Sequence, residues 1–157
     1  MGLDYMIDAR VKNRETKEVI TIDIAYWRKC YSLRDVLQDC AREKNPSSVK
    51  KIDGDYYTRC HRRILHNVVQ ELSRRIADPD DFAWASSIWS RDSVRYSTCN
   101  ELGKLCVAEE FFNPTFNTSE DIIATASRAF DYDEDVLADI FLNPSKYKIS
   151  IEFINSY

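Results

Sequence analysis

The sequence predicts an α+β fold, in which a small antiparallel sheet made of an N-terminal hairpin and a C-terminal strand packs against about five helices. Apolar and polar residues alternate near both ends of the chain, which is typical of half-buried strands. Between those ends, apolar residues recur every three or four positions, which is typical of amphipathic helices. The length of 157 residues, with 44% hydrophobic and 31% charged side chains, suits a single globular domain over residues 1–157.

The sheet is expected to form from three segments. Residues 3–11 alternate in polarity, residues 13–17 are typical of a turn, and residues 20–24 alternate again, so these three stretches predict a hairpin. Residues 147–153 alternate as well but have no neighbouring strand in the sequence. This last strand is therefore expected to add to the N-terminal hairpin and to be integral to the core.

The expected helices lie between these strands. The first begins at Ser32 as N-cap and is ended by residues 45–48, and residues 50–55 follow as a polar loop or short strand. The strongest pattern covers residues 57–77, and its apolar stripe contains His61, which is interpreted as a core histidine. Residues 82–89 are an irregular aromatic stretch. The remaining helices cover residues 93–112, a segment capped by Thr118 or Ser119, and a segment opened by residues 131–135 and ended by residues 143–144.

Cysteine usage and the absence of sorting signals favour a cytoplasmic protein. The five cysteines are odd in number and widely spaced, with no C-x-x-C pair, which favours free thiols. On residues 93–112, Cys99 and Cys106 are expected on the apolar side as small buried side chains. No signal peptide and no stretch of 18 apolar residues is found, so no membrane segment is expected. No metal site and no cofactor is predicted.

Charge is distributed unevenly along the chain. Residues 1–77 carry 16 basic and 11 acidic side chains, whereas residues 78–157 carry 6 basic and 15 acidic ones. The acidic half is a candidate surface for a basic protein partner. The densest candidates are Asp131, Asp133, Glu134, Asp135 and Asp139. Those before the last helix are expected to project into solvent, with only a helix-dipole role.

The basic half supplies an alternative, the binding of a nucleic acid or nucleotide anion. In the expected helix over residues 57–77, one face carries Arg59, Arg62, Arg63, His66 and Arg74, which could contact phosphates. A second candidate anion site is Trp27, Arg28 and Lys29, beside the start of the next expected helix. The sequence pI of about 5.3 opposes general nucleic-acid binding.

Specific enzyme signatures are missing from the sequence. It contains no nucleotide-binding glycine loop, no nucleophile elbow and no kinase motif. A metal-dependent enzyme is the weakest alternative and would use acidic pairs such as Asp53 and Asp55 around Gly54. A non-enzymatic protein is the preferred interpretation.

Two short motifs add a resemblance. The chain opens Met1-Gly2-Leu3-Asp4 and carries Tyr26-Trp27-Arg28-Lys29 before an expected helix, and in both it resembles a group of small uncharacterised tailed-phage and prophage proteins. The resemblance covers about the first 40 residues, and the chain departs from the usual pattern at Tyr5-Met6 and at Cys30.

The resemblance implies a phage- or prophage-encoded accessory protein in a bacterial cytoplasm. Such a protein would act by binding a host or viral protein. Inhibition of a bacterial defence nuclease, as anti-CRISPR proteins do, is the sharpest form of this hypothesis. Nucleic acid is the less favoured partner.

Overall fold

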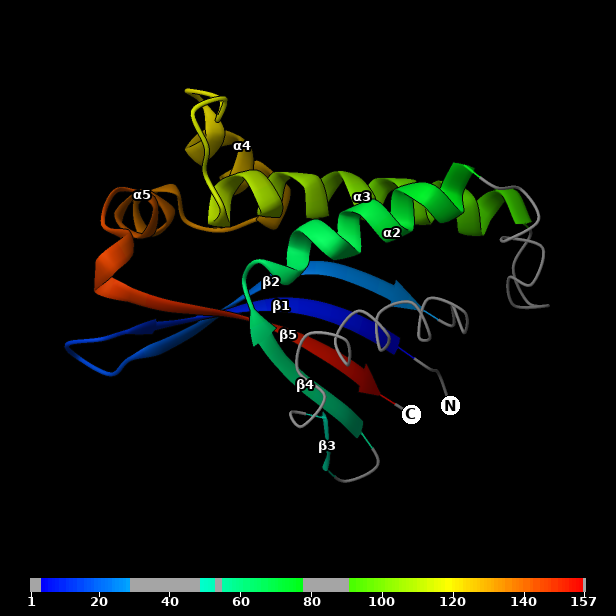
Figure 1. Ribbon diagram of the computed structural model, residues 1–157, viewed down its shortest axis with the longest axis horizontal. Helices are drawn as coiled ribbons and strands as arrows, with labels where there is room; N and C mark the ends of the chain where they lie inside the picture. Colours follow the sequence, from blue (N-terminus) through cyan, green and yellow to red (C-terminus); the bar gives the residue numbers. More distant parts are fainter. Residues whose placement is uncertain (1–3, 29–48, 53–54, 78–90, 157) are drawn as a thin grey trace.

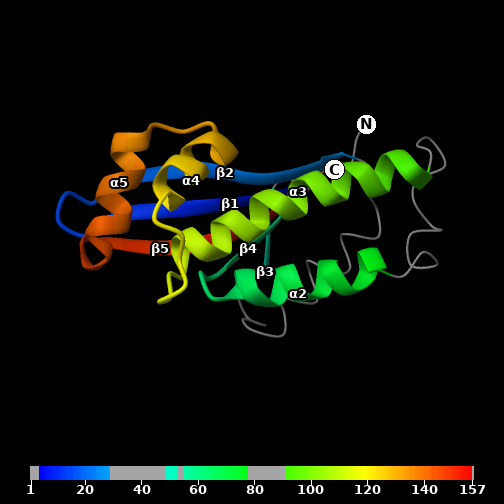
Figure 2. The ribbon, with the colours of Figure 1, turned by 90° about the horizontal axis from the view of Figure 1, so that it is seen from above.

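Five antiparallel strands form a single sheet in the order β2-β1-β5-β4-β3, and those helices that belong to the described residues lie on one side of it (Figures 1 and 2). The computed structural model describes residues 4–28, 49–52, 55–77 and 91–156. The strands are β1 (Asp4–Asn13), β2 (Val19–Arg28), β3 (Val49–Ile52), β4 (Asp55–His61) and β5 (Tyr147–Ser156). The helices are α2 (Ile64–Ala77), α3 (Arg91–Phe112), α4 (Ile122–Phe130), α5 (Glu134–Leu142) and the short 3-10 helix η2 (Pro144–Lys146).

This architecture confirms the predicted α+β class, but the numbers of strands and helices differ from the prediction. The sheet has five strands where three were expected, because residues 49–61 form a second hairpin. Among the described residues there are four α-helices rather than about five. The helix expected from Ser32 and the aromatic stretch over residues 82–89 lie outside the described residues.

The C-terminal strand β5 lies in the middle of the sheet. It pairs with β1 over its whole length, from Asp4–Ser156 to Asn13–Tyr147, as the sequence predicts. On its other side it pairs with β4, from Tyr56–Asn155 to His61–Ser150. The last strand of the chain therefore joins the two hairpins into one sheet.

A β-bulge in the first hairpin sets which side chains face the helices. Ile7 pairs with Ala25 but Asp8 pairs with Asp23, which leaves Ile24 as the extra residue on β2. Ile24 and Ala25 are both buried as a result. The same shift places Asp8 directly opposite Asp23.

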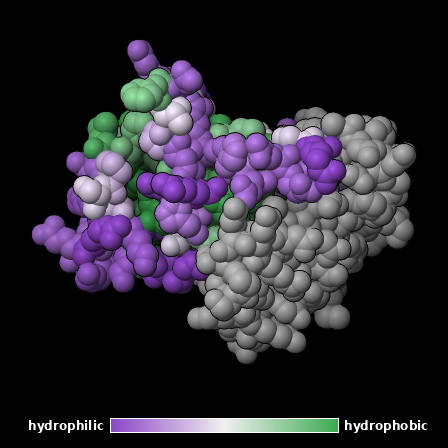
Figure 3. Space-filling view, in the orientation of Figure 1, coloured by the Kyte–Doolittle hydropathy of each residue, from purple (hydrophilic) through white to green (hydrophobic). Residues whose placement is uncertain are grey.

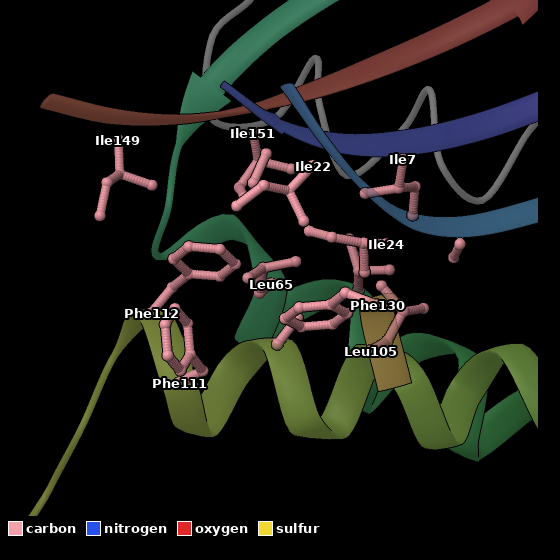
Figure 4. Close-up of a cluster of buried hydrophobic side chains, with 14 of the residues drawn as sticks. Ile7, Ile22, Ile24, Leu65, Leu105, Phe111, Phe112, Phe130, Ile149 and Ile151 are labelled. Atoms are coloured by element: carbon pink, nitrogen blue, oxygen red, sulfur yellow. The ribbon is translucent and has the colours of Figure 1, made fainter. Parts of the chain in front are cut away.

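The core lies between the sheet and α3. Figure 4 shows isoleucines of β1, β2 and β5 directed at Leu105, Phe111 and Phe112 of α3, with Phe130 of α4 beside them. The rings of Phe112 and Phe130 stack with centroids 6.2 Å apart, and those of Phe111 and Phe112 meet edge to face at 4.9 Å.

The buried face of α3 differs from the predicted one. The sequence analysis placed Cys106 among its buried side chains, but Cys106 is exposed. Leu105, Ala108, Phe111 and Phe112 are buried instead. Their spacing of three and four residues selects the face that carries the two phenylalanines, whose apolar area outweighs that of a cysteine.

The start of α2 was also predicted wrongly. Residues expected to begin this helix at Tyr57 belong to β4, and α2 begins only at Ile64. Thr58 and Cys60 are buried while Arg59 and His61 are exposed, which is the alternation of a strand. The apolar stripe that predicted the helix begins only at Ile64, and the predicted helix was extended too far toward the N-terminus. His61 is therefore no core histidine.

The cap of α4 is a smaller correction. Asp121 stands at the N-cap position, where Thr118 or Ser119 was expected. The hydroxyl of Thr118 instead accepts a hydrogen bond from the backbone N–H of Thr115 at 2.7 Å, which closes a turn before the helix.

We expect replacement of Ile151 by alanine to lower the free energy of unfolding by about 2–5 kcal/mol, because the side chain is 0% exposed in the central strand. Urea denaturation followed by circular dichroism measures the loss. Leu142→Ala is the matched control, since Leu142 is 67% exposed and its truncation is expected to cost under about 0.5 kcal/mol. Equal losses in the two variants would contradict the central position of β5.

Candidate anion-binding site

A cavity of about 580 Å³ lies where β4 leaves the sheet. The last pair between β4 and β5 is His61–Ser150, after which the chain turns through Arg62 and Arg63 into α2. β5 extends beyond that pair to Tyr147, so a notch forms beside its first residues. The cavity is lined by Arg14, Arg59, Cys60, His61, Arg62, Pro144, Ser145, Tyr147, Lys148, Ile149 and Ser150.

Four cationic residues from separate parts of the chain line this cavity. They are Arg14 of the β1–β2 turn, Arg59 of β4, Arg62 of the β4–α2 turn and Lys148 of β5. None of the described residues that line the cavity is acidic. Arg14, Arg62 and Lys148 form no ion pair with any other described residue. An anion in the cavity would therefore meet positive charge from three unpaired side chains.

The backbone around the cavity is held by long-range hydrogen bonds. The N–H of Arg14 donates to the carbonyl of Lys146 at 2.9 Å, which ties the hairpin turn to η2. The amide of Asn113 donates to the carbonyl of Arg62 at 3.1 Å, which ties the β4–α2 turn to the end of α3. These bonds leave the guanidinium groups of both arginines available to a ligand.

Arg59 is positioned by a buried carboxylate. Glu152 lies opposite Arg59 in the sheet and is 9% exposed, and its Oε1 lies 3.4 Å from Nε of Arg59 and 3.8 Å from Nε of Arg10. The charges of the two arginines offset the cost of burying this carboxylate, and removal of both would leave the buried charge uncompensated. Glu152 thus holds Arg59 at the edge of the cavity.

His61 contributes a directed donor. Partial burial, followed by the charges of Arg62 and Arg63, holds its pKa below the usual 6.5, so the free ring is neutral at pH 7. Its Nδ1 accepts a hydrogen bond from the N–H of Arg63 at 3.2 Å, and the proton of the neutral ring is therefore assigned to Nε2. An anion beside His61 would raise this pKa again.

A second cavity of about 910 Å³ adjoins the first, sharing His61, Arg62 and Pro144. Its other lining residues are Arg63, Ile64, His66, Asn67, Glu109, Asn113, Pro114 and Thr115. Nδ1 of His66 lies 2.6 Å from Oε1 of Glu109, so the one acidic side chain of this lining is already partnered. The first turn of α2, which borders this cavity, contains no acidic residue.

On the face of the sheet opposite the described helices, the acids of neighbouring strands form a row. Asp8 faces Asp23 on one side and Glu152 on the other. Burial raises the pKa of Asp8 to about 7, with the charge and hydrogen bond of Asp23 and the charge of Glu152 adding to the effect. The sequence analysis missed this group, because alternation alone assigned Asp8 to a solvated face.

The predicted basic helix face is divided in the structure. Arg59, Arg62 and Arg63 lie at the two cavities, but on a strand and a turn rather than on a helix. Arg74 lies further along α2, where its guanidinium binds Glu71 at 2.6 Å. In these cavities, the sequence analysis missed Arg14, His61 and Lys148 as ligands. Only the sheet register brings them together.

The predicted anion site at Trp27, Arg28 and Lys29 is not formed by the described residues. Trp27 is 2% exposed and belongs to the core, because it follows Ala25 on the helix-facing side of β2. Arg28 ends β2, and Lys29 lies outside the described residues, as do Asp53 and Gly54 of the suggested cation loop.

Two of the predicted acidic residues have structural roles. The carboxylate of Asp133 caps α5 by accepting a hydrogen bond from the N–H of Val136 at 3.1 Å, so its role exceeds the dipole effect expected from the sequence. Asp139 accepts hydrogen bonds from the hydroxyl of Tyr147 and from Lys146, and these bonds lower its pKa. Asp131, Glu134 and Asp135 are exposed.

The described residues offer little for metal or thiol chemistry. No three His, Cys, Asp or Glu side chains among them are grouped as a metal site. Cys106 is a free thiol, and partial burial together with Glu109 raises its pKa, so the thiol stays protonated at neutral pH. None of the described helices has the length and apolar character needed to span a membrane.

The chain was compared with family models, curated proteins and solved structures, and nothing matched in any of the three comparisons.

We expect the Asp8→Asn variant to change how stability depends on pH. Folding raises the pKa of Asp8 from 3.8 to about 7. Between these two pH values the folded protein therefore binds one more proton than the unfolded protein. The free energy of unfolding of the wild type consequently falls as the pH rises from about 4 to about 7. Asparagine removes this contribution. The stability of Asp8→Asn relative to wild type, measured by urea denaturation, should therefore increase between about pH 4 and about pH 8. Asp135→Asn, at an exposed position, is the control. Parallel pH profiles for wild type and Asp8→Asn would refute this account of the acidic row.

Proposed function

We propose that this protein is a non-enzymatic binding protein for a phosphate-bearing ligand of the nucleotide or nucleic-acid class, held in the smaller cavity. The observation that carries the proposal is the convergence of Arg14, Arg62 and Lys148 on a cavity without an acidic lining residue. Guanidinium groups donate paired hydrogen bonds in the geometry that phosphate oxygens accept. This is the anion-binding alternative of the sequence analysis, at a site that only partly overlaps the predicted one.

Charge explains how an acidic protein can hold such a site. The net charge of −4 acts over the whole surface, whereas phosphate recognition depends on the field within about one Debye length, roughly 8–10 Å. The cationic residues of the cavity come from four segments, and their electrostatic potentials add inside the cavity. Binding there is local rather than the general nucleic-acid coating that the pI opposes.

The direct test is a titration with pyrophosphate, followed by NMR of the histidine rings and by calorimetry. The chain has only two histidines, so His61 reports on the smaller cavity, and its pKa is expected to rise when the anion binds. Affinity should consequently increase as the pH falls through the pKa of His61.

Arg62→Gln is expected to weaken pyrophosphate binding by about 10-fold or more, because charge-assisted hydrogen bonds contribute about 1.5–3 kcal/mol each. Arg128→Gln is the matched control, since Arg128 is exposed on α4 and lines neither cavity. An unchanged His61 pKa at saturating pyrophosphate, or equal affinities for the two variants, would contradict the proposed function.

A second candidate function, kept from the phage resemblance, is binding of a basic protein partner at the start of α5. Asp131, Glu134 and Asp135 are exposed there and form no ion pair with any other described residue. Exposed charges of one sign speed the encounter with a surface of opposite sign. The phage origin and the inhibition of a defence nuclease belong to this proposal.

For this second candidate, the variant Glu134→Lys/Asp135→Lys keeps the capping Asp133 and is expected to remain folded. After the partner is recovered from phage-infected cells, its association should be slowed by about 10-fold at low salt, and less at high salt. Identical association rates across the salt series would leave these residues as an ordinary helix start.

A further inference from the structure

The larger cavity has the lining of a site for a nucleobase. Ile64 and the prolines Pro114 and Pro144 supply apolar surface, and Asn67 and Asn113 supply amide groups that can both donate and accept hydrogen bonds. Pockets for small organic groups combine these two features. The larger cavity shares His61 and Arg62 with the smaller one. A ligand whose phosphate lies at Arg62 in the smaller cavity can therefore place its base in the larger cavity.

An exposed aromatic ring follows this lining in the chain. Phe116 comes directly after Thr115 and is fully exposed, at 108% of its reference area. In Figure 3, pale green hydrophobic atoms lie near the top of the molecule, in the region of the segment between α3 and α4, next to purple hydrophilic atoms. A phenylalanine presented in this way is costly to solvate and suits a flat partner.

The turn that carries Phe116 is fixed by hydrogen bonds. The N–H of Thr115 donates to the hydroxyl of Thr118 at 2.7 Å, and the N–H of Thr118 donates to the carbonyl of Thr115 at 3.1 Å. The N–H of Ser119 donates to Glu110 of α3 at 2.6 Å. The backbone that carries the ring is thus held in place before any ligand arrives, which reduces the entropy that binding must overcome.

We infer that the ligand is a single-stranded nucleic acid, with a phosphate in the smaller cavity, its base in the larger cavity and a neighbouring base stacked on Phe116. This inference rests on the proposed function and extends it from a phosphate to a strand. Cationic grooves combined with exposed aromatic rings are the means by which proteins bind single strands without reading their sequence. The cavities and Phe116 supply both parts.

The test compares pyrophosphate, thymidine monophosphate and an oligothymidylate of about ten nucleotides, with the matching oligouridylate separating DNA from RNA. The oligonucleotide is expected to bind more tightly than the monophosphate. Phe116→Ala should lower oligonucleotide affinity by about 5- to 100-fold and leave pyrophosphate affinity unchanged. Phe116→Trp should restore stacking. Because Phe116 is fully exposed, these variants are expected to keep the wild-type melting temperature.

Leu142→Ala, which removes another exposed apolar side chain, is the control and should bind like wild type. Equal affinities for oligonucleotide and monophosphate, or an oligonucleotide affinity unaffected by Phe116→Ala, would overturn this inference while pyrophosphate binding still supports the proposed function. The inference is also overturned if Phe116→Ala weakens binding of a protein partner and leaves oligonucleotide binding unchanged. Absence of pyrophosphate binding would instead refute the proposed function itself.

Discussion

The pairing of β5 with both β1 and β4 is the constraint on which the rest of the structure depends. The chain makes two hairpins that are 20 residues apart at their nearest ends, Arg28 and Val49, and its last strand enters between them. A strand in this position supplies hydrogen bonds on both edges and buries Ile149, Ile151 and Phe153 against the helices. It also sets the register that brings Ser150 opposite His61 and Glu152 opposite Arg59. The basic cavity is therefore a consequence of the fold rather than of any local motif.

The two faces of the sheet carry different side chains, one apolar and one charged. Isoleucines and aromatic rings face the helices, and the opposite face carries the row Asp23, Asp8, Glu152 and Arg59 across four strands. Burial, with the charge and hydrogen bond of Asp23 and the charge of Glu152 adding to it, raises the pKa of Asp8 to about 7. For Glu152, the charges of Arg10 and Arg59 offset the cost of burial. Burial of these acids costs folding free energy, and one of them, Glu152, holds the guanidinium group of Arg59 at the edge of the cavity.

The predictable parts of the fold are those with strong local patterns. The N-terminal hairpin, the end of α3 at Phe112 and the terminal strand each carry clear alternation or a helical stripe, and the structure confirms them. The first residues of the predicted helix over 57–77 were assigned wrongly, because the helical stripe begins only at Ile64 and the alternation of residues 58–61 is too short to be a strong strand pattern. The site was beyond local reasoning for a related reason: Arg14 and Lys148 are 134 positions apart and meet only through strand pairing. Arg59, Arg62 and Arg63 could be named as candidates because they are clustered in the sequence.

The central claim is that strand pairing assembles a phosphate site from four separate segments, and a crystal structure of the complex with pyrophosphate tests it most directly. The account predicts an anion in the smaller cavity within hydrogen-bond distance of the guanidinium groups of Arg14 and Arg62, the ammonium group of Lys148 and Nε2 of His61. A structure in which pyrophosphate occupies another surface, with these side chains turned away from one another, would contradict it.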